Sequence, residues 1–341
     1  MNFNHSQGWN FVFSALIHVE YFMMEMDILT LLLDSGLVFL SIVMLWKGAD
    51  WLVDSASEIA HSLKVSDLII GLTIVAFGTS APEFAVTISA AFTKQTDISI
   101  GNVIGSNIFN LGFILGGTAL IRPIVTTPKL FYRDGFFLLI TTALIFLLFF
   151  GIDGWTSNDS FTKLEGLLLF GLLIAYISFL FIKKEPPEEI HPTKANVNSY
   201  LFFLLGLLLI VYGGHLMVAH VSNIARAMGI SDWVIAVTIV AAGTSAPEFA
   251  TSIAAALKGR HNIAVGNLIG SDLFNLLGVL GLAGMINPAS VDEDIYMSIF
   301  NLVLMVGLVL VLIRTNWKIN RKEGGILVAI NLIRWYFDFA S

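Results

Sequence analysis

The chain contains one segment twice, and this ungapped repeat limits it to a fold with two related halves. Residues 78–117 align with residues 243–282 at a constant offset of 165 positions, and 22 of the 40 aligned positions are identical. Each copy begins with Gly-Thr-Ser-Ala-Pro-Glu-Phe-Ala, at residues 78–85 and 243–250. A match of this length is no compositional accident, so we expect two homologous structural units.

Composition places both units in a membrane. Of the 341 residues, 56% are hydrophobic and 13% are charged, and the mean hydropathy is +0.83, whereas soluble domains are ~45–50% apolar and ~25% charged. A membrane-spanning helix needs ~20 mostly apolar residues, and this template predicts ten spans. They are residues 32–56, 66–92, 98–120, 132–151, 163–182, 200–222, 231–257, 263–285, 295–313 and 324–339. The runs are too long and too apolar for the ~10-residue strands of a membrane barrel, so the predicted fold is an all-α polytopic membrane protein.

The repeat divides these spans equally. We expect an N-terminal extension at residues 1–31, a first five-helix repeat at 32–182, a linker at 183–199 and a second five-helix repeat at 200–341. Because five is an odd number, the second repeat must enter the membrane in the opposite sense to the first. Two inverted repeats are a plan that many secondary transporters share.

The basic residues predict the orientation. If the connections from each odd-numbered span to the next even-numbered span (the odd-to-even connections) lie on one side of the membrane, that side holds 13 of the 18 Lys and Arg residues. Lys and Arg accumulate in cytoplasmic loops, so we expect a multi-pass protein of the cell's inner (cytoplasmic) membrane, with a cytoplasmic linker and both termini outside the cytoplasm. Residues 1–25 contain no Lys or Arg and no Ala-x-Ala cleavage pattern, so they do not resemble a signal peptide. We keep Met24 or Met26 as an alternative hypothesis for the start of the protein.

The repeated motif is costly inside a membrane. Pro82 and Pro247 lack an N–H, and their rings clash with the carbonyl four residues earlier, so each should break its helix in mid-span. Glu83 and Glu248 follow directly, and an ionisable residue at this depth indicates a functional site. A serine three residues before each glutamate also fits a capping box. Capping alone leaves a helix start deep in hydrocarbon, where freed backbone groups need a partner, so we expect a cation site.

A second repeated pattern supplies further oxygen atoms. It reads Gly-Asn-Val-Ile-Gly-Ser-Asn-Ile-Phe-Asn at 101–110 and Gly-Asn-Leu-Ile-Gly-Ser-Asp-Leu-Phe-Asn at 266–275. Within it, Ser106 and Asn110 lie one helical turn apart on the same face, as do Ser271 and Asn275. Ion binding is the favoured interpretation of these pairs, and hydrogen bonding between helices is the alternative.

The candidate ligands are all hard oxygens, which suit Na⁺, Ca²⁺ or Mg²⁺ better than zinc or copper. Asp272 stands where the first half has Asn107, and it is a candidate third acid near the centre. The chain has no Cys, and His215 and His220 are five positions apart, unlike a helical zinc pair. There is no Gly-rich phosphate loop with Lys and no long run of basic residues. The sequence thus predicts no enzyme, no cofactor and no nucleic-acid partner.

With Gly-Thr-Ser-x-Pro-Glu and Gly-Asn-x-x-Gly-Ser-Asn/Asp-x-x-Asn in both halves, the chain resembles the calcium/cation antiporter superfamily, specifically its prokaryotic sodium/calcium exchangers. The resemblance covers nearly the whole chain after residue 30 and implies a ten-helix inverted-repeat fold with electrogenic exchange of Na⁺ for Ca²⁺. It implies a Ca²⁺ site made of Thr79, Glu83, Thr244 and Glu248. The implied Na⁺ ligands are the carbonyls of Ala76 and Ala241 and the side chains of Ser80, Ser106, Asn110, Ser245, Ser271 and Asn275.

One position departs from part of that superfamily. Some members, including the potassium-dependent branch, have Asp where this chain has Asn275. The resemblance therefore does not imply potassium dependence. The proton-coupled branch usually departs from Gly-Ser-Asn in the partner helix, which favours sodium coupling here.

Three hypotheses follow for the function. The first is a secondary Ca²⁺ antiporter driven by Na⁺, which works by alternating access in the lipid bilayer without an obligate protein partner. The second is the same carrier driven by H⁺, since Glu83 and Glu248 could serve either coupling ion. The third is a passive cation channel, although two inverted halves around one buried site favour a carrier.

Overall fold

The computed structural model describes residues 5–150, 160–183, 195–230, 241–290 and 293–340. Its regular structure is helical, apart from four strands of two residues each. The α-helices are α1 (His5–Leu63), α2 (Asp67–Ile70), α3 (Ala76–Thr79), α4 (Ala81–Phe92), α5 (Thr96–Phe109), α6 (Leu115–Ile121), α7 (Phe136–Phe150), α8 (Lys163–Lys183), α9 (Val197–Ala227), α11 (Ala241–Thr244), α12 (Ala246–Leu257), α13 (His261–Leu273), α14 (Leu280–Ile286), α15 (Glu293–Asn316) and α16 (Arg321–Ala340). In the described residues, four π-helical stretches continue or join them: η1 (Gly71–Val75), η2 (Asn110–Ile114), η3 (Leu130–Gly135) and η5 (Phe274–Val279).

Seven helical stretches among the described residues are long and apolar enough to cross a membrane. They are Ile28–Leu63, Ile98–Ile121, Leu130–Phe149, Lys163–Lys183, Val197–Ala227, His261–Ile286 and Ile295–Asn316. The bent pair Asp67–Thr79 and Ala81–Phe92 would be an eighth span. The predicted span 231–257 begins outside the described residues, and the predicted span 324–339 lies in α16, which is helical but not among the seven. The ten-span, inverted-repeat plan therefore stays a prediction.

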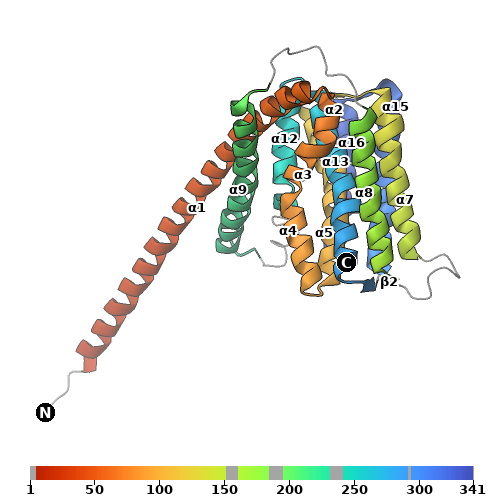
Figure 1. The fold of residues 1–341 in the computed structure, drawn as a ribbon. Coiled ribbons are helices and arrows are strands. Elements are labelled where there is room, and N and C mark those ends of the chain that lie inside the picture. Colours follow the sequence, from red (N-terminus) through yellow and green to blue (C-terminus); the bar gives the residue numbers. More distant parts are fainter. Residues whose placement is uncertain (1–4, 151–159, 184–194, 231–240, 291–292, 341) are drawn as a thin grey trace.

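The N-terminal part of the chain is helical from His5. α1 continues without interruption through residue 31, where the sequence predicted the end of an extension. From its middle onward, α1 lies beside α9 at one edge of the bundle (Figure 1). The two helices cross at Gly48 and Gly206, where a Cβ atom on either glycine would lie 2.8 Å from the carbonyl oxygen of the other. Any side chain at these two positions would push the helices apart.

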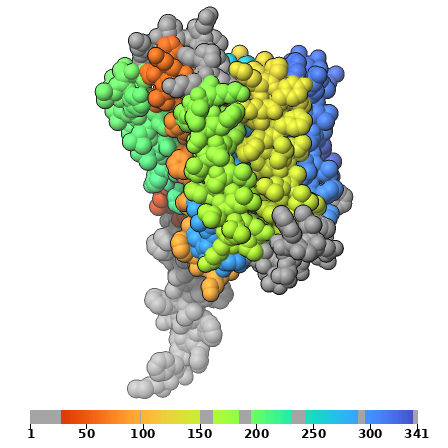
Figure 2. Space-filling view, turned by 45° about the vertical axis from the view of Figure 1, so that its right-hand side comes forward, coloured from red at the N-terminus to blue at the C-terminus, as the bar shows by residue number. Residues whose placement is uncertain are grey.

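The outer surface of the bundle carries many apolar side chains. In Figure 2, α7 and α8 lie next to one another and form much of one face. Leu167, Leu168 and Ile174 on α8 are about half exposed. Because an exposed apolar surface of this extent is unfavourable in water, it fits contact with the lipid bilayer that the composition predicted.

Both repeated motifs contain the predicted break. The helix axis bends by 52° between Asp67–Thr79 and Ala81–Phe92, and Ser80 lies at the bend. Pro82 and Pro247 occupy the first turn of α4 and α12, where a missing N–H has no cost. The capping box is wrong, however, because neither Ser80 nor Ser245 caps its helix through its side chain. Their ψ angles of 8° and 9° differ from the extended backbone of an N-cap serine.

Two short strand pairs join the halves at the helix ends. β1 (Ile124–Val125) pairs antiparallel with β4 (Lys318–Ile319), and β2 (Ser160–Phe161) pairs with β3 (Ala289–Ser290). β1 and β3 are 165 positions apart, so the equivalent strand of each half pairs with a strand of the other half. β2 marks the lower end of the bundle in Figure 1. The first pair joins two odd-to-even connections and the second joins two even-to-odd connections.

The centre of the bundle is packed closely through glycines. α13 lies against α2 and η1, where the Cβ that Gly71 lacks would lie 3.2 Å from the Cα of Gly266. A Cβ on Gly266 would lie 2.9 Å from the carbonyl oxygen of Leu68. This close approach places the polar side chains of α13 directly beside the break at Ser80.

Candidate functional site

Two buried glutamates form the centre of the site. Glu83 lies in the first turn of α4 and Glu248 in the first turn of α12, and both are fully buried. Ser245 Oγ donates a hydrogen bond to Glu83 Oε1 at 2.8 Å, and Ser80 Oγ donates to Glu248 Oε1 at 3.0 Å. Each carboxylate is therefore held by the serine of the other half, so the two motifs form one site.

The threonines of the motifs lie at the same place. Thr79 ends α3 and Thr244 ends α11, and their hydroxyls interact with Glu248 and Glu83, respectively. Thr79 Oγ1 also lies 3.3 Å from Ser271 Oγ, which donates to Glu248 Oε1 at 3.3 Å. The structure thus brings together the four residues that the resemblance implied for Ca²⁺, with Ser271 beside them.

Two asparagines that the sequence analysis left without a role support both glutamates. Asn102 Nδ2 donates to the main-chain carbonyl of Glu83 at 3.3 Å, and Asn267 Nδ2 donates to that of Glu248 at 3.4 Å. Asn267 Oδ1 accepts a hydrogen bond from Thr79 Oγ1 at 2.9 Å. The signal for them was their occurrence in the Gly-Asn pair of both copies.

A set of four residues lies where α5 meets η2 and α13 meets η5. Asn110 Nδ2 donates to Asp272 Oδ1 at 3.0 Å, and Asn275 Nδ2 donates to Asn107 Oδ1 at 3.2 Å. Asn107 Nδ2 donates to the main-chain carbonyl of Asp272 at 3.4 Å. All four residues are almost fully buried. Asp272 therefore contacts Asn110, which the resemblance placed in the ion site.

Five side-chain oxygens of these buried residues have no hydrogen-bond partner in the described part of the chain. They are Oε2 of Glu83 and Glu248, Oδ2 of Asp272, and Oδ1 of Asn110 and Asn275. A buried acceptor without a donor costs ~1–3 kcal/mol, and more when it is charged. The ion pairs Arg133–Asp134, Lys258–Asp54 and Arg260–Asp67 lie elsewhere in the structure. The oxygens of this site can be satisfied by a bound cation.

The other predicted ligands have less informative surroundings. The carbonyl of Ala76 already accepts hydrogen bonds from Ser80 N at 3.0 Å and Thr79 Oγ1 at 3.3 Å. Ser106 is buried on α5, and Ala241 is the first residue of α11. Within the described ranges, no three His, Cys, Asp or Glu side chains gather as a metal cluster.

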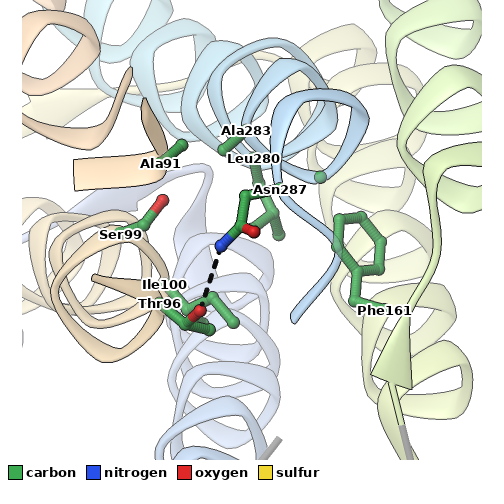
Figure 3. A pocket seen from close by; sticks show the side chains of 9 residues that line it. Ala91, Thr96, Ser99, Ile100, Phe161, Leu280, Ala283 and Asn287 are labelled. Atoms are coloured by element: carbon green, nitrogen blue, oxygen red, sulfur yellow. Dashed lines mark hydrogen bonds between the residues drawn. The ribbon is translucent and has the colours of Figure 1, made fainter. Parts of the chain in front are cut away.

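A run of polar groups leads from this site to a small pocket between α4, α5 and α14. Figure 3 shows Thr96, Ser99 and Asn287 in its wall, with Asn287 Nδ2 donating to Thr96 Oγ1 at 3.3 Å. Ser99 Oγ donates to the carbonyl of Thr87 at 3.2 Å, and Thr87 Oγ1 accepts from Asn102 at 2.9 Å. These contacts connect the pocket to the glutamate turn of α4.

The chain is similar to several known proteins. The family described as sodium/calcium exchanger protein matches residues 34–182 and 198–338. The sodium/calcium exchanger MaX1 of Methanosarcina acetivorans is 36% identical over 333 residues, covering 86% of this chain and 94% of MaX1. The inner membrane protein YrbG of Escherichia coli is 30% identical over 322 residues, covering 89% of this chain and 96% of YrbG.

A solved structure shows the same fold. The sodium-calcium exchanger NCX_Mj superposes with a TM-score of 0.77 at 31% identity, covering 89% of this chain and 98% of NCX_Mj. Its likeness and the family match extend over both halves of the chain, which confirms the resemblance seen in the repeated motifs. The chain belongs to the sodium/calcium exchanger family.

Proposed function

We propose that the protein is a secondary active antiporter that exchanges Na⁺ for Ca²⁺ across the inner membrane. The observation that carries this proposal is the crosswise pair Ser245–Glu83 and Ser80–Glu248, which joins two buried carboxylates from the two halves. Membership of the sodium/calcium exchanger family supports cation/Ca²⁺ antiport. The relative MaX1 and the structural neighbour NCX_Mj are both named as sodium/calcium exchangers.

In this proposal the two glutamates hold Ca²⁺ together with Thr79 and Thr244. Ca²⁺ takes six to eight oxygen ligands, and two carboxylates balance its charge. The Na⁺ ligands are the carbonyls of Ala76 and Ala241, the hydroxyls of Ser80, Ser106, Ser245 and Ser271, and the amides of Asn110 and Asn275. Because the two ion sets share the same pocket of oxygens, full occupancy by one excludes the other, and this competition couples their transport.

We propose alternating access, in which two inverted halves open one midplane site to either side in turn. The reciprocal strand pairs β1–β4 and β2–β3 support a pseudo-symmetric arrangement of the halves. In this proposal the breaks at Ser80 and Ser245 act as hinges beside the ions. The excess of Lys and Arg in the odd-to-even connections supports termini outside the cytoplasm.

The test uses proteoliposomes loaded with Na⁺ and diluted into Na⁺-free medium that contains ⁴⁵Ca²⁺. We expect Ca²⁺ to accumulate above equilibrium, and we expect a pH gradient without Na⁺ to give no accumulation. Accumulation on the pH gradient alone would show a proton-coupled carrier instead, and simple equilibration would show a channel.

The residue-level test replaces each central glutamate. Glu83→Gln and Glu248→Gln should each abolish Ca²⁺ transport, because each removes one of the two carboxylates that hold the ion. Glu165→Gln is the matched control, since Glu165 is a mostly buried glutamate that caps α8 through Thr162 N at 2.6 Å, away from the site. Normal exchange in both central variants would refute ion binding by these carboxylates.

A further inference from the structure

The two halves differ at one pair of equivalent positions beside the site. Asn107 and Asp272 are related by the offset of 165, and so are Asn110 and Asn275. The hydrogen bond from Asn110 Nδ2 to Asp272 Oδ1 at 3.0 Å therefore has an exact counterpart, from Asn275 Nδ2 to Asn107 Oδ1 at 3.2 Å. The packing of this four-residue cluster is symmetric, although its charge is not.

The symmetry fails at the next contact. Asn107 Nδ2 donates to the main-chain carbonyl of Asp272 at 3.4 Å. In the counterpart of this contact, a carboxylate oxygen of Asp272 takes the place of the Nδ2 donor, so no hydrogen bond to the carbonyl of Asn107 can form. Two acceptors cannot form a hydrogen bond. Asp272 Oδ2 indeed has no partner among the described residues, and Asp272 is fully buried.

Two further oxygens of the same cluster are available to a cation. Asn110 Oδ1 and Asn275 Oδ1 are also buried and without a partner in the described chain, and both amides belong to the same cluster. The cluster thus offers one carboxylate and two neutral amide oxygens. A single negative charge with neutral oxygens balances a monovalent hard cation, whereas Ca²⁺ sites usually combine several carboxylates.

We propose that Asp272 binds one Na⁺ together with the side-chain oxygens of Asn110 and Asn275. This inference rests on the proposed Na⁺/Ca²⁺ exchange and adds a residue to it.

The experiment counts Na⁺ ions on purified protein in detergent, using ²²Na⁺ binding at saturation. We expect Asp272→Asn to bind about one Na⁺ fewer per chain than the wild type, and its Hill coefficient for Na⁺ displacement of ⁴⁵Ca²⁺ to fall accordingly. Saturable ⁴⁵Ca²⁺ binding and a monodisperse elution profile establish that the variant is folded. Because the variant gives position 272 the residue found at its counterpart, the fold should accommodate it.

The matched variant moves the carboxylate from the second half to the first. The double substitution Asn107→Asp with Asp272→Asn places the carboxylate at the equivalent position of the first half, so it should restore the lost Na⁺. An unchanged Na⁺ count in Asp272→Asn would refute the inference. An unchanged count with an altered pH dependence of Ca²⁺ binding would assign a proton to Asp272 and would equally refute it.

The outcome is separable from that of the proposed function. If wild-type vesicles accumulate Ca²⁺ only on a pH gradient, the proposed coupling fails. The Na⁺ count on Asp272→Asn is measured at equilibrium without any gradient, so it tests the Asp272 site in either case.

Discussion

Replacing Gly270 with alanine tests the packing on which the site depends. A methyl group at this position of α13 would lie 2.7 Å from Ala76 Cβ, 2.7 Å from the carbonyl oxygen of Leu72 and 2.8 Å from Leu72 Cα. Non-bonded carbon atoms pack at ~3.5–4.0 Å. The neighbouring atoms belong to the backbone or to a Cβ, so none can rotate away. α13 must therefore move from the η1–α3 segment by roughly 1 Å.

This displacement has two measurable consequences. Overpacking of a close-packed interior costs ~1–3 kcal/mol of unfolding free energy. The shift also acts on Ser271, whose Oγ lies 3.3 Å from both Thr79 Oγ1 and Glu248 Oε1. These two contacts are near the limit of a hydrogen bond, and ~1 Å more would break them. We therefore expect lower stability and weaker Ca²⁺ binding together.

The assay compares Gly270→Ala with Gly171→Ala. Gly171 lies on α8, where an added Cβ would meet no other atom within 4 Å. Alanine in a helix interior is ~0.5–1 kcal/mol more favourable than glycine, so the control should be as stable as the wild type or more so. The thermal midpoint in detergent and the Kd for ⁴⁵Ca²⁺ are measured on both variants. A wild-type midpoint and Kd for Gly270→Ala would refute the close contact between α13 and the η1–α3 segment.

Three further predictions follow from contacts of other kinds. Ser80→Ala and Ser245→Ala should lower the stability of the ion-free protein by similar amounts, ~1.5–3 kcal/mol, because each removes one donor from a buried glutamate. Thermal denaturation measures both variants, and a loss seen in only one of them would contradict the reciprocal geometry. Lys258→Gln removes partly exposed ion pairs to two aspartates of α1 at 2.8 and 3.0 Å. The unfolding free energy should fall by at most ~1 kcal/mol, and by less at high salt. A larger loss that does not depend on salt would show that the pairs are not screened. Tyr176→Phe removes a buried hydrogen bond to Asp134 Oδ1 at 2.8 Å. The thermal midpoint should therefore fall by the equivalent of ~1–3 kcal/mol, while the affinity for ⁴⁵Ca²⁺ stays that of the wild type. A wild-type midpoint would argue against that contact.

Much of the site could be predicted because its determinants are local and occur twice. Pro82 predicts a helix break at a defined residue, since a proline ring excludes the preceding helical hydrogen bond. Glu83 in an apolar run predicts burial with a function. The constant offset then predicts that Glu248 has the same role. The structure confirms the break and places both glutamates together.

The contacts between the halves could not be predicted in this way. Nothing local to Ser80 indicates that its hydroxyl would reach Glu248 of the other half, and the pattern with Glu83 pointed to a capping box within the same helix. The π-helical stretches η1, η2 and η5 were not expected either, because a single extra residue per turn leaves no periodic signal in so short a run. The two-residue strands are likewise too short for an alternating pattern.

The crosswise hydrogen bonds have a consequence for biosynthesis. Glu83 is synthesised 162 residues before Ser245, whose hydroxyl donates the hydrogen bond to its carboxylate. During that interval the first half carries a buried acid without its donor, and the second half is needed to supply it. The proposed ion site therefore forms only after the second half has inserted beside the first. Co-expressed halves should regain Ca²⁺ binding only when both are present in one membrane.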